Sequence, residues 1–330
     1  MIINFLIIIQ GKMKICNDLC SLVYQKLVEQ NIISAHEKIL LNPYYDVNLH
    51  GKQYSHYIIK CLYSKQNFFL KISKGDDTSS HCNDYLRNFH NEIGEYIYPL
   101  ILVPEFEFCG VRYFITTFVD GISLDKISES LTTNDWENIS QKLLVRLDEL
   151  STVHAPLYSE HNKFVTNDCA TILKIKFSNR FKHPLFVKYS YKELDKAFKR
   201  CCQILDNSHF TKPTLLHMDV KPANIIYNFK TGFVTLIDFE FARFGDADYG
   251  WAQVLLSGIN AFCAEYKKQV IPCMTSGRLT LKEALTISKY QCYIFYQTAC
   301  NLIYYYDRNM DCPKDMKQLF EKLLNKLSQE

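Results

Sequence analysis

The chain has 330 residues, a length that favours about two domains or lobes and allows a large hydrophobic core. The hydrophobic share of 48% and the charged share of 22% are those of an ordinary globular protein. Its 38 basic and 35 acidic residues are mixed along the chain and give a net charge of +3, which excludes the basic surface expected of a nucleic-acid partner or an anionic membrane.

The cysteines favour reduced thiols in the cytoplasm. Their number is odd at 13, the chain is long, and no secretory leader with a small-residue cleavage site precedes them. No pair of CxxC units is present, so the spacing does not predict a zinc site. The apolar run from Ile2 to Ile9 is too short to span a bilayer, and Met13 is an alternative translation start. We therefore expect no membrane partner, and the oligomeric state stays open.

The first part of the chain predicts one helix followed by strands. Apolar residues recur at helical spacing from Met13 to Ile33. The segment from Tyr44 to Ser73 then reads as three strands, with a loop at His50 to Ser55 between the first two. Alternation in the third strand puts Lys71 on the face opposite Leu70. A lysine among large apolar residues is costly to bury without an anionic partner, such as a phosphate, and the alternative is a lysine on a solvated edge strand.

Further along, helices become dominant. The segment from Asp84 to Leu100 predicts a helix, and Pro104 to Val119 predicts two strands joined across residues 109–111. From Ser123 onward the pattern is helical, with Thr133 or Asn134 as the cap of a helix that runs to Leu150. This order predicts an α+β fold with two lobes, residues 1–118 and 119–330, the second mostly helical.

The stretch from Leu215 to Ala242 carries the chemistry. Two short strands, Ile225 to Tyr227 and Phe233 to Ile237, are separated by a turn, so the hairpin brings Asn224 beside Asp238. A carboxylate and an amide oxygen side by side are hard ligands suited to Mg²⁺.

The same stretch also offers a base. Asp219 lies five residues before Asn224, at the mouth of the predicted metal site, where it can accept the proton of an attacking hydroxyl. A structural alternative stays open, in which His217 and Asp219 satisfy a buried turn and Asn224 caps a strand.

Three motifs carry a resemblance to a known family. HMDVKPAN, from His217 to Asn224, resembles the HxDxxxxN catalytic loop of protein kinases and aminoglycoside phosphotransferases. Asp238, in IDFE, stands where kinases carry the metal-binding DFG. IDFE and GDADYGWA are more similar to the aminoglycoside phosphotransferase and choline-kinase-like family than to protein kinases. The resemblance implies a two-lobed protein-kinase-like fold, with an antiparallel sheet and a helix in the first lobe.

The resemblance also implies roles for residues near the nucleotide. Lys71 would hold the α and β phosphates of ATP, paired with Glu92, with Glu95 as the competing partner. The loop at Gly51 to Ser55 would cover the phosphates through its backbone, although it lacks a GxGxxG pattern. Adenine would be bound by backbone groups of a hinge, for which the candidates are Thr117, Phe118 and Val119.

For the reaction itself, the resemblance implies that Asn224 and Asp238 hold Mg²⁺ and that Asp219 is the catalytic base. Lys221 matches the lysine of the kinase-type KP and would neutralise charge on the moving phosphoryl group. One departure concerns the family pattern GDPxxDLA, whose second aspartate braces the catalytic loop. Gly250 occupies that position here, and Asp248 lies two residues early.

We therefore expect an ATP- and Mg²⁺-dependent phosphotransferase acting on a hydroxyl of a small molecule, either an antibiotic or a metabolite. From Phe241 onward, nine acidic residues stand against eleven basic ones, which does not favour a strongly cationic acceptor. Two alternatives stay open. One is a protein Ser/Thr kinase, and the other is a nucleotide-binding pseudokinase that acts as a binding module.

Overall fold

The chain divides into two compact units between Val119 and Asp120. The computed structural model describes residues 17–49, 52–73, 79–93, 98–160, 164–189, 191–260 and 266–329. None of the helices in these ranges is long and apolar enough to cross a membrane.

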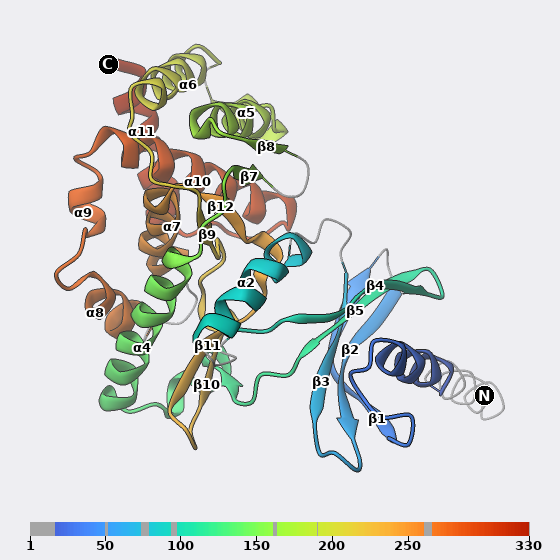
Figure 1. Ribbon diagram of the computed structural model, residues 1–330. Helices are drawn as coiled ribbons and strands as arrows, with labels where there is room; N and C mark the ends of the chain where they lie inside the picture. Colours follow the sequence, from blue (N-terminus) through green and yellow to red (C-terminus); the bar gives the residue numbers. More distant parts are fainter. Residues whose placement is uncertain are drawn as a thin grey trace, which may run out of the picture. The chain divides into compact units, whose positions relative to one another are not determined.

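The first unit is built on a five-stranded antiparallel sheet with the strand order β1-β2-β3-β5-β4 (Figure 1). A helical segment, residues 17–29, precedes the sheet. Its elements are β1 (Ile39–Leu49), β2 (Lys52–Cys61), β3 (Asn67–Ile72), α2 (Ser79–Ile93), β4 (Ile101–Phe108) and β5 (Val111–Thr117).

The helical segment packs on one face of this sheet. Leu19, Val23 and Leu27 recur at four-residue spacing and are fully buried in the same cluster as Ile59 and Leu70 of the sheet. The predicted amphipathic helix and the predicted alternation of the third strand are therefore confirmed, and the strand face that carries Leu70 is the core face.

Two boundaries in this unit differ from prediction. The first strand begins at Ile39, ahead of Tyr44, and the ladder between β1 and β2 continues to the pair Leu49 and Lys52. Ser55 is therefore a strand residue paired with Asp46, and the loop predicted at residues 50–55 is shorter. The polar residues misled the prediction because an antiparallel ladder needs only backbone groups.

The end of α2 is the second difference. Tyr98 to Leu100, predicted as the last turn of the helix, are not helical. Pro99 disfavours the helical conformation of the residue before it, which accounts for the earlier end. The prediction of two strands before Val119 is confirmed, and Pro104 is accommodated because β4 is an edge strand with shifts in its register.

The second unit is mostly helical. Its first half contains β6 (Ile122–Ser123), α3 (Leu124–Ile127), a 3-10 turn (Ser128–Ser130), α4 (Thr133–Thr152), β7 (Tyr158–Glu160), β8 (Phe164–Thr166), α5 (Cys169–Phe181), a 3-10 turn (Pro184–Lys188) and α6 (Tyr191–Asp206). The cap of α4 is Thr132, one residue before the predicted positions, and it forms a reciprocal capping box with Asp135.

The second half of this unit carries the predicted chemistry. It contains β9 (Thr214–Leu216), a 3-10 turn (Pro222–Asn224), β10 (Ile225–Asn228), β11 (Phe233–Leu236), a 3-10 turn (Phe239–Phe241), β12 (Arg243–Gly245), α7 (Ala247–Asn260), a π turn (Tyr266–Val270), α8 (Ile271–Thr275), α9 (Leu281–Ala284), α10 (Ser288–Asp307) and α11 (Lys314–Gln329).

The core of the second unit is centred on α10, which packs against α6, α7 and α11 (Figure 1). Most of its aromatic side chains are buried, although Tyr304 and Tyr306 near its end are exposed: Tyr293 and Phe295 are fully enclosed, and Phe295 stacks on Phe320 of α11 with ring centroids 5.1 Å apart. The helix α10 is therefore a core helix of this unit. Because β9 pairs with β12 and β10 pairs with both β11 and β6, short ladders hold the intervening loops against this helical core.

Candidate functional site

The hairpin of β10 and β11 brings Asn224 and the segment before Asp238 together, as predicted. Ile225 pairs with Leu236, and the backbone N–H of Ile237 donates to the carbonyl oxygen of Asn224 at 2.9 Å. Asp238 directly follows this last bond. An amide and a carboxylate fourteen residues apart in sequence therefore lie at the same end of one ladder.

Asp219 is held by two donors on a single carboxylate oxygen. Asn224 Nδ2 donates to Oδ2 at 2.7 Å and to the backbone oxygen of Asp219 at 2.9 Å, and Lys221 Nζ lies 2.6 Å from the same Oδ2. The 3-10 turn at Pro222–Asn224 makes this possible because it folds the chain back after Lys221. Within the described chain Oδ1 receives no bond, so it is the oxygen that can accept a proton from an incoming hydroxyl.

His217 ties the loop to the hairpin. Its Nε2 donates to the carbonyl oxygen of Ile237 at 2.8 Å, and its Nδ1 accepts the backbone N–H of Asp219 at 3.3 Å. Only the neutral ring protonated at Nε2 makes both bonds. Burial lowers the pKa of His217, with the nearby Asp219 charge opposing, so the neutral form is the stable one. His217 therefore positions the loop.

Two backbone conformations in the site are unusual. Met218 and Asp238 both have positive φ, at 63° and 68°. Residues other than glycine rarely adopt this left-handed region, and such strain persists only where surrounding contacts enforce it. One of these residues directly precedes Asp219, and the other is the predicted metal ligand, so one strained residue adjoins the predicted base and the other is itself the predicted ligand.

The charges of Lys221 and Asp219 support each other. Burial lowers the pKa of Lys221, but the charge and the hydrogen bond of Asp219 raise it. With smaller contributions from Asp238 and the Tyr304 phenol, the pKa of Lys221 lies above its usual range. The Lys221 side chain is still 49% exposed, against 19% for Asp219. A cation that is paired with the base and also open to solvent is suited to contact an incoming phosphoryl group.

Lys71 lies where the strand alternation placed it. Its neighbours Leu70 and Ile72 are buried in the core of the first unit, whereas Lys71 is half-buried on the other face, with Nζ 5.7 Å from the ring centroid of its cross-strand partner Phe114. Glu92 lies exposed on α2. Ser55 is placed by its backbone in β2, and Gly51 lies outside the described residues.

The three hinge candidates differ in their bonding. The N–H of Thr117 donates to the carbonyl oxygen of Leu100 at 2.9 Å, and its Oγ1 accepts the Leu100 N–H at 3.0 Å. Thr117 is therefore engaged in holding the end of β5 to the segment before β4. Phe118 and Val119 lie after the end of β5 and before β6, so their backbone groups are the better candidates for binding the adenine ring.

The oxygen donors fit a magnesium ion that takes most of its ligands from elsewhere. Among the described residues no cluster of three or more His, Cys, Asp or Glu side chains forms. Because Asn224 turns its Nδ2 toward Asp219, its Oδ1 faces away from that residue and is the ligand atom that Asn224 can offer beside Asp238. Mg²⁺ keeps several waters and shares phosphate oxygens, so one amide and one carboxylate suffice on the protein side.

Asp248 does not brace the catalytic loop. It accepts from Lys289 Nζ at 2.6 Å and from the Tyr290 hydroxyl at 2.8 Å, both on α10. The loop contact from α7 comes instead from Gln253, whose Oε1 accepts the N–H of Val220 at 3.4 Å. Sequence reasoning missed Gln253. Gln253 lies three residues after Gly250, on the same face of α7, but no helix was predicted there from the sequence.

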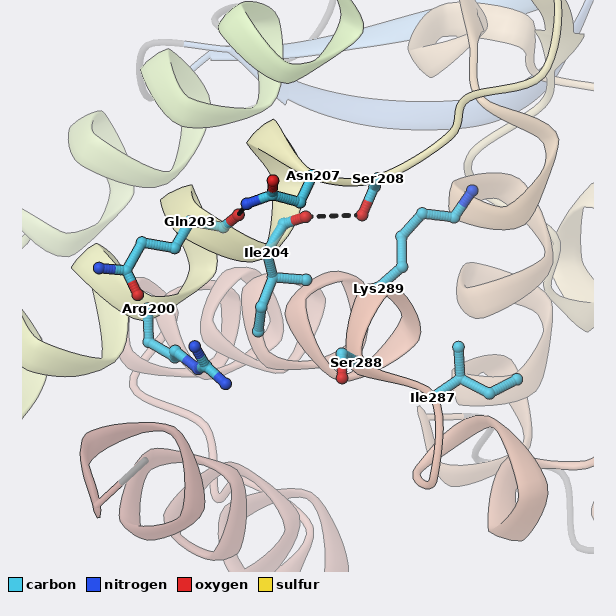
Figure 2. Close-up of a pocket in the computed structure, with 8 residues that line it drawn as sticks. All are labelled: Arg200, Gln203, Ile204, Asn207, Ser208, Ile287, Ser288 and Lys289. Atoms are coloured by element: carbon cyan, nitrogen blue, oxygen red, sulfur yellow. Dashed lines mark hydrogen bonds between the residues drawn. The ribbon is translucent and has the colours of Figure 1, made fainter.

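A separate hollow of about 500 Å³ lies between the end of α6 and the start of α10 (Figure 2). The side chains of Asn207 and Ser208 donate hydrogen bonds to backbone carbonyl oxygens of α6. The Lys289 ammonium forms ion pairs with Asp246 and Asp248. None of the predicted site residues lines this hollow. The chemistry is therefore assigned to the loop at residues 217–224 and not to this hollow.

The fold and these motifs define the class as a kinase-like phosphotransferase. The structure is similar to that of a thermostable mutant of aminoglycoside phosphotransferase APH(4)-Ia in a ternary complex with AMP-PNP and hygromycin B, with a TM-score of 0.60, 13% identity, and coverage of 92% of this chain and 98% of that one. It is also similar to a protein assigned as a fructosamine-3-kinase of Haemophilus somnus 129PT, with a TM-score of 0.58, 14% identity, and coverage of 92% and 96%.

Sequence comparison gives the family. The profile of the phosphotransferase enzyme family matches residues 98–271, which is more than half of the 330 residues. The chain belongs to this family, and the predicted resemblance and α+β kinase-like fold are confirmed. A search of curated proteins finds no match.

Proposed function

We propose that the protein transfers the γ-phosphoryl group of ATP to a hydroxyl of a small molecule. The observation that carries the proposal is the state of Asp219: its Oδ2 is saturated by Asn224 and Lys221, whereas Oδ1 is left to accept a proton. A base with one oriented oxygen suits in-line attack by a hydroxyl, and most of the rate enhancement comes from positioning and charge stabilisation.

On the nucleotide side, residues 1–118 form the nucleotide-binding lobe and residues 119–330 the catalytic lobe. Lys71 contacts the α and β phosphates, Glu92 pairs with Lys71, and the backbone from Gly51 to Ser55 covers the phosphates. Backbone groups at Phe118 and Val119 bind adenine, and Thr117 fixes the strand that leads to them. Support comes from family membership and from the position of Lys71 on the face opposite the core.

Asn224 and Asp238 hold Mg²⁺, which supplies charge neutralisation at the phosphates. Lys221 contributes a second positive charge to the moving phosphoryl group. Asp219 orients the acceptor hydroxyl and takes its proton. Of these four side chains, Asn224 has a double role because the same amide that offers Oδ1 also orients Asp219 through Nδ2.

The acceptor is a small hydroxyl compound, an antibiotic or a metabolite. The similar structure of a thermostable mutant of aminoglycoside phosphotransferase APH(4)-Ia is a ternary complex with AMP-PNP and hygromycin B. For this chain the near balance of acidic and basic residues after Phe241 favours an acceptor that is neutral or carries one charge. We place the reaction in the cytoplasm, where ATP is supplied and where the free thiols of the eleven described cysteines stay reduced.

A screen for phosphoryl transfer tests the proposal. Purified protein is incubated with ATP, Mg²⁺ and pools of hydroxylated antibiotics and metabolites, and products are sought by mass spectrometry as an added phosphoryl mass. We expect a product with the wild-type protein and none with Asp219→Asn. A product formed equally by both proteins contradicts the assigned base. Transfer only to added proteins would instead favour a protein kinase, and nucleotide binding without transfer would favour a pseudokinase.

Lys71 gives an independent test of the nucleotide side. Lys71→Met should raise the KM for ATP by about 10- to 100-fold, the equivalent of one hydrogen bond to a charged group. Lys60→Met is the matched control, because Lys60 is an exposed lysine on the neighbouring strand β2 and should leave KM unchanged. Equal KM values for the two variants would remove Lys71 from the phosphate site.

A further inference from the structure

The backbone around Asp219 is anchored at consecutive amides. The N–H of Asp219 donates to His217, and the next N–H, that of Val220, donates to Gln253 Oε1 at 3.4 Å. Val220 is 1% exposed, so its N–H is removed from solvent and requires a partner inside the protein. The loop also contains Met218 at φ 63°, a conformation that needs such enforcement.

The anchor cannot come from position 250. A Cβ on Gly250 would lie 2.7 Å from Leu216 Cδ2, and a Cβ on Gly245 would lie 2.6 Å from Leu216 Cδ1. Leu216 thus packs directly on two glycines immediately before the loop, and it is itself buried. A side chain at position 250 would require Leu216 to shift, so the present packing of Leu216 fits a glycine there.

Gln253 lies one turn further along α7, on a part of the helix that is rigidly held. Asp246, before the first turn of α7, accepts from Thr211, Tyr293 and Lys289. The carbonyl oxygen of Tyr249 accepts from Gln297 Nε2 at 3.0 Å. The helix that carries Gln253 is therefore held by contacts with the helical core, independently of the loop that Gln253 contacts.

We propose that Gln253 is the positioning residue of the catalytic loop, holding the Val220 N–H so that the preceding carboxylate of Asp219 keeps its orientation toward the acceptor hydroxyl. This inference depends on the proposed function for the role of Asp219. Position 250 carries an aspartate in the motif GDPxxDLA, and Gln253 replaces that charged brace with a neutral acceptor. The loop is then anchored without placing a further negative charge beneath the base.

Two variants separate the hydrogen bond from packing. Gln253→Leu keeps the approximate size of the side chain and removes the acceptor, whereas Gln253→Glu keeps an acceptor oxygen at the same reach. Gln253→Leu should lower kcat by about 10- to 100-fold with little change in the KM for ATP, since a displacement near 1 Å in the catalytic geometry has an effect of this size. Gln253→Glu should recover most of the turnover.

Ser257→Ala is the matched control on the same helix. The Ser257 hydroxyl donates to the carbonyl oxygen of Val254 within α7, so its loss perturbs the helix without touching the loop. We expect wild-type kcat from it. If Gln253→Leu also keeps wild-type kcat, or if Gln253→Glu is as impaired as Gln253→Leu, the inference is overturned.

Amide exchange of the loop supplies a readout that needs no acceptor. In hydrogen-exchange mass spectrometry, the peptide that contains Val220 should exchange faster in Gln253→Leu than in the wild type and at the wild-type rate in Ser257→Ala. If Gln253→Leu exchanges faster than the wild type but the wild-type protein transfers no phosphoryl group, the anchor is retained and the proposed function is rejected. Unchanged exchange in Gln253→Leu would reject the anchor whatever the activity.

Discussion

Asn224 donates its side-chain amide to both the backbone oxygen and the carboxylate of Asp219, at 2.9 and 2.7 Å. The two residues are five apart in sequence, and Asn224 is nearly fully buried. Both donor hydrogens of the amide are therefore committed to the base, and its oxygen points elsewhere. Loss of this one side chain should release the base and remove a metal ligand together.

Asn224→Ala should lower kcat by about 10²- to 10⁴-fold, the contribution of a positioned general base. The matched control is Asn228→Ala at the other end of β10, where the side chain bonds to Asp120 and to the N–H groups of Lys230 and Thr231 in the hairpin turn. Steady-state kinetics measure kcat for both variants, and we expect a loss only in Asn224→Ala. Similar losses in both would mean that the hairpin, and not the contact with Asp219, governs activity.

Asp238 should control the requirement for Mg²⁺. Asp238→Asn keeps the shape of the side chain and removes its charge, so the Mg²⁺ concentration for half-maximal activity should rise on the order of tenfold or more. Asp248→Asn serves as the control, because Asp248 is occupied by Lys289 and Tyr290. A Mg²⁺ titration of activity checks this, and an unshifted midpoint in Asp238→Asn would exclude this residue as a ligand.

The hairpin and the loop at residues 217–224 could be predicted from the sequence because their determinants are local. The strands of the hairpin are short apolar runs around a polar turn, and the functional residues flank them directly. The strand that holds Lys71 was likewise predicted from its alternation. In both cases the residues next to the functional side chain in the sequence determine where that side chain lies.

Features that depend on distant contacts could not be predicted in the same way. Ser55 was placed in a loop because its neighbours are polar, whereas the ladder with β1 makes it a strand residue. The glycine at position 250 is explained by its contact with Leu216, which lies 34 positions earlier in the chain. The anchor of the loop is a hydrogen bond from Val220 to Gln253, which lies 33 positions later. No local sequence pattern shows which distant side chain makes such a contact.

The stability of the first unit should depend on pH through His90. His90 is buried at the end of α2, accepts the N–H of Tyr98 at 3.2 Å and stacks on its ring. Burial lowers the pKa of His90 from 6.5 to about 4. As the pH falls the unfolded chain takes up this proton first, so stability is fully present above about pH 6.5 and is lost progressively down to about pH 4.

The expected loss is at most about 1.4 kcal/mol per pH unit across that window. Urea unfolding of the wild type at pH 7.5, 6 and 5, monitored by hydrogen exchange in α2, measures it. His90→Gln should flatten this dependence, and His36→Gln, at an exposed histidine, should not. An equally steep loss in His90→Gln would assign the acid sensitivity to other groups.

The contact between Leu216 and Gly250 should couple packing to catalysis. Gly250→Ala places a Cβ 2.7 Å from Leu216 Cδ2, so either Leu216 or α7 must shift, at a cost of about 1 to 3 kcal/mol. Because Leu216 directly precedes His217, the shift should also reduce kcat.

A double-mutant cycle isolates this contact. Leu216→Ala alone should destabilise by about 2 to 5 kcal/mol, since it leaves a cavity in the core. In that background Gly250→Ala should cost almost nothing because the obstructing Cδ2 is gone, so the two free-energy changes should fall short of additivity. Denaturant unfolding of the four proteins measures the coupling. If the losses in free energy of unfolding are additive, Leu216 does not obstruct a side chain at position 250. The contact with Leu216 would then not explain the glycine at this position.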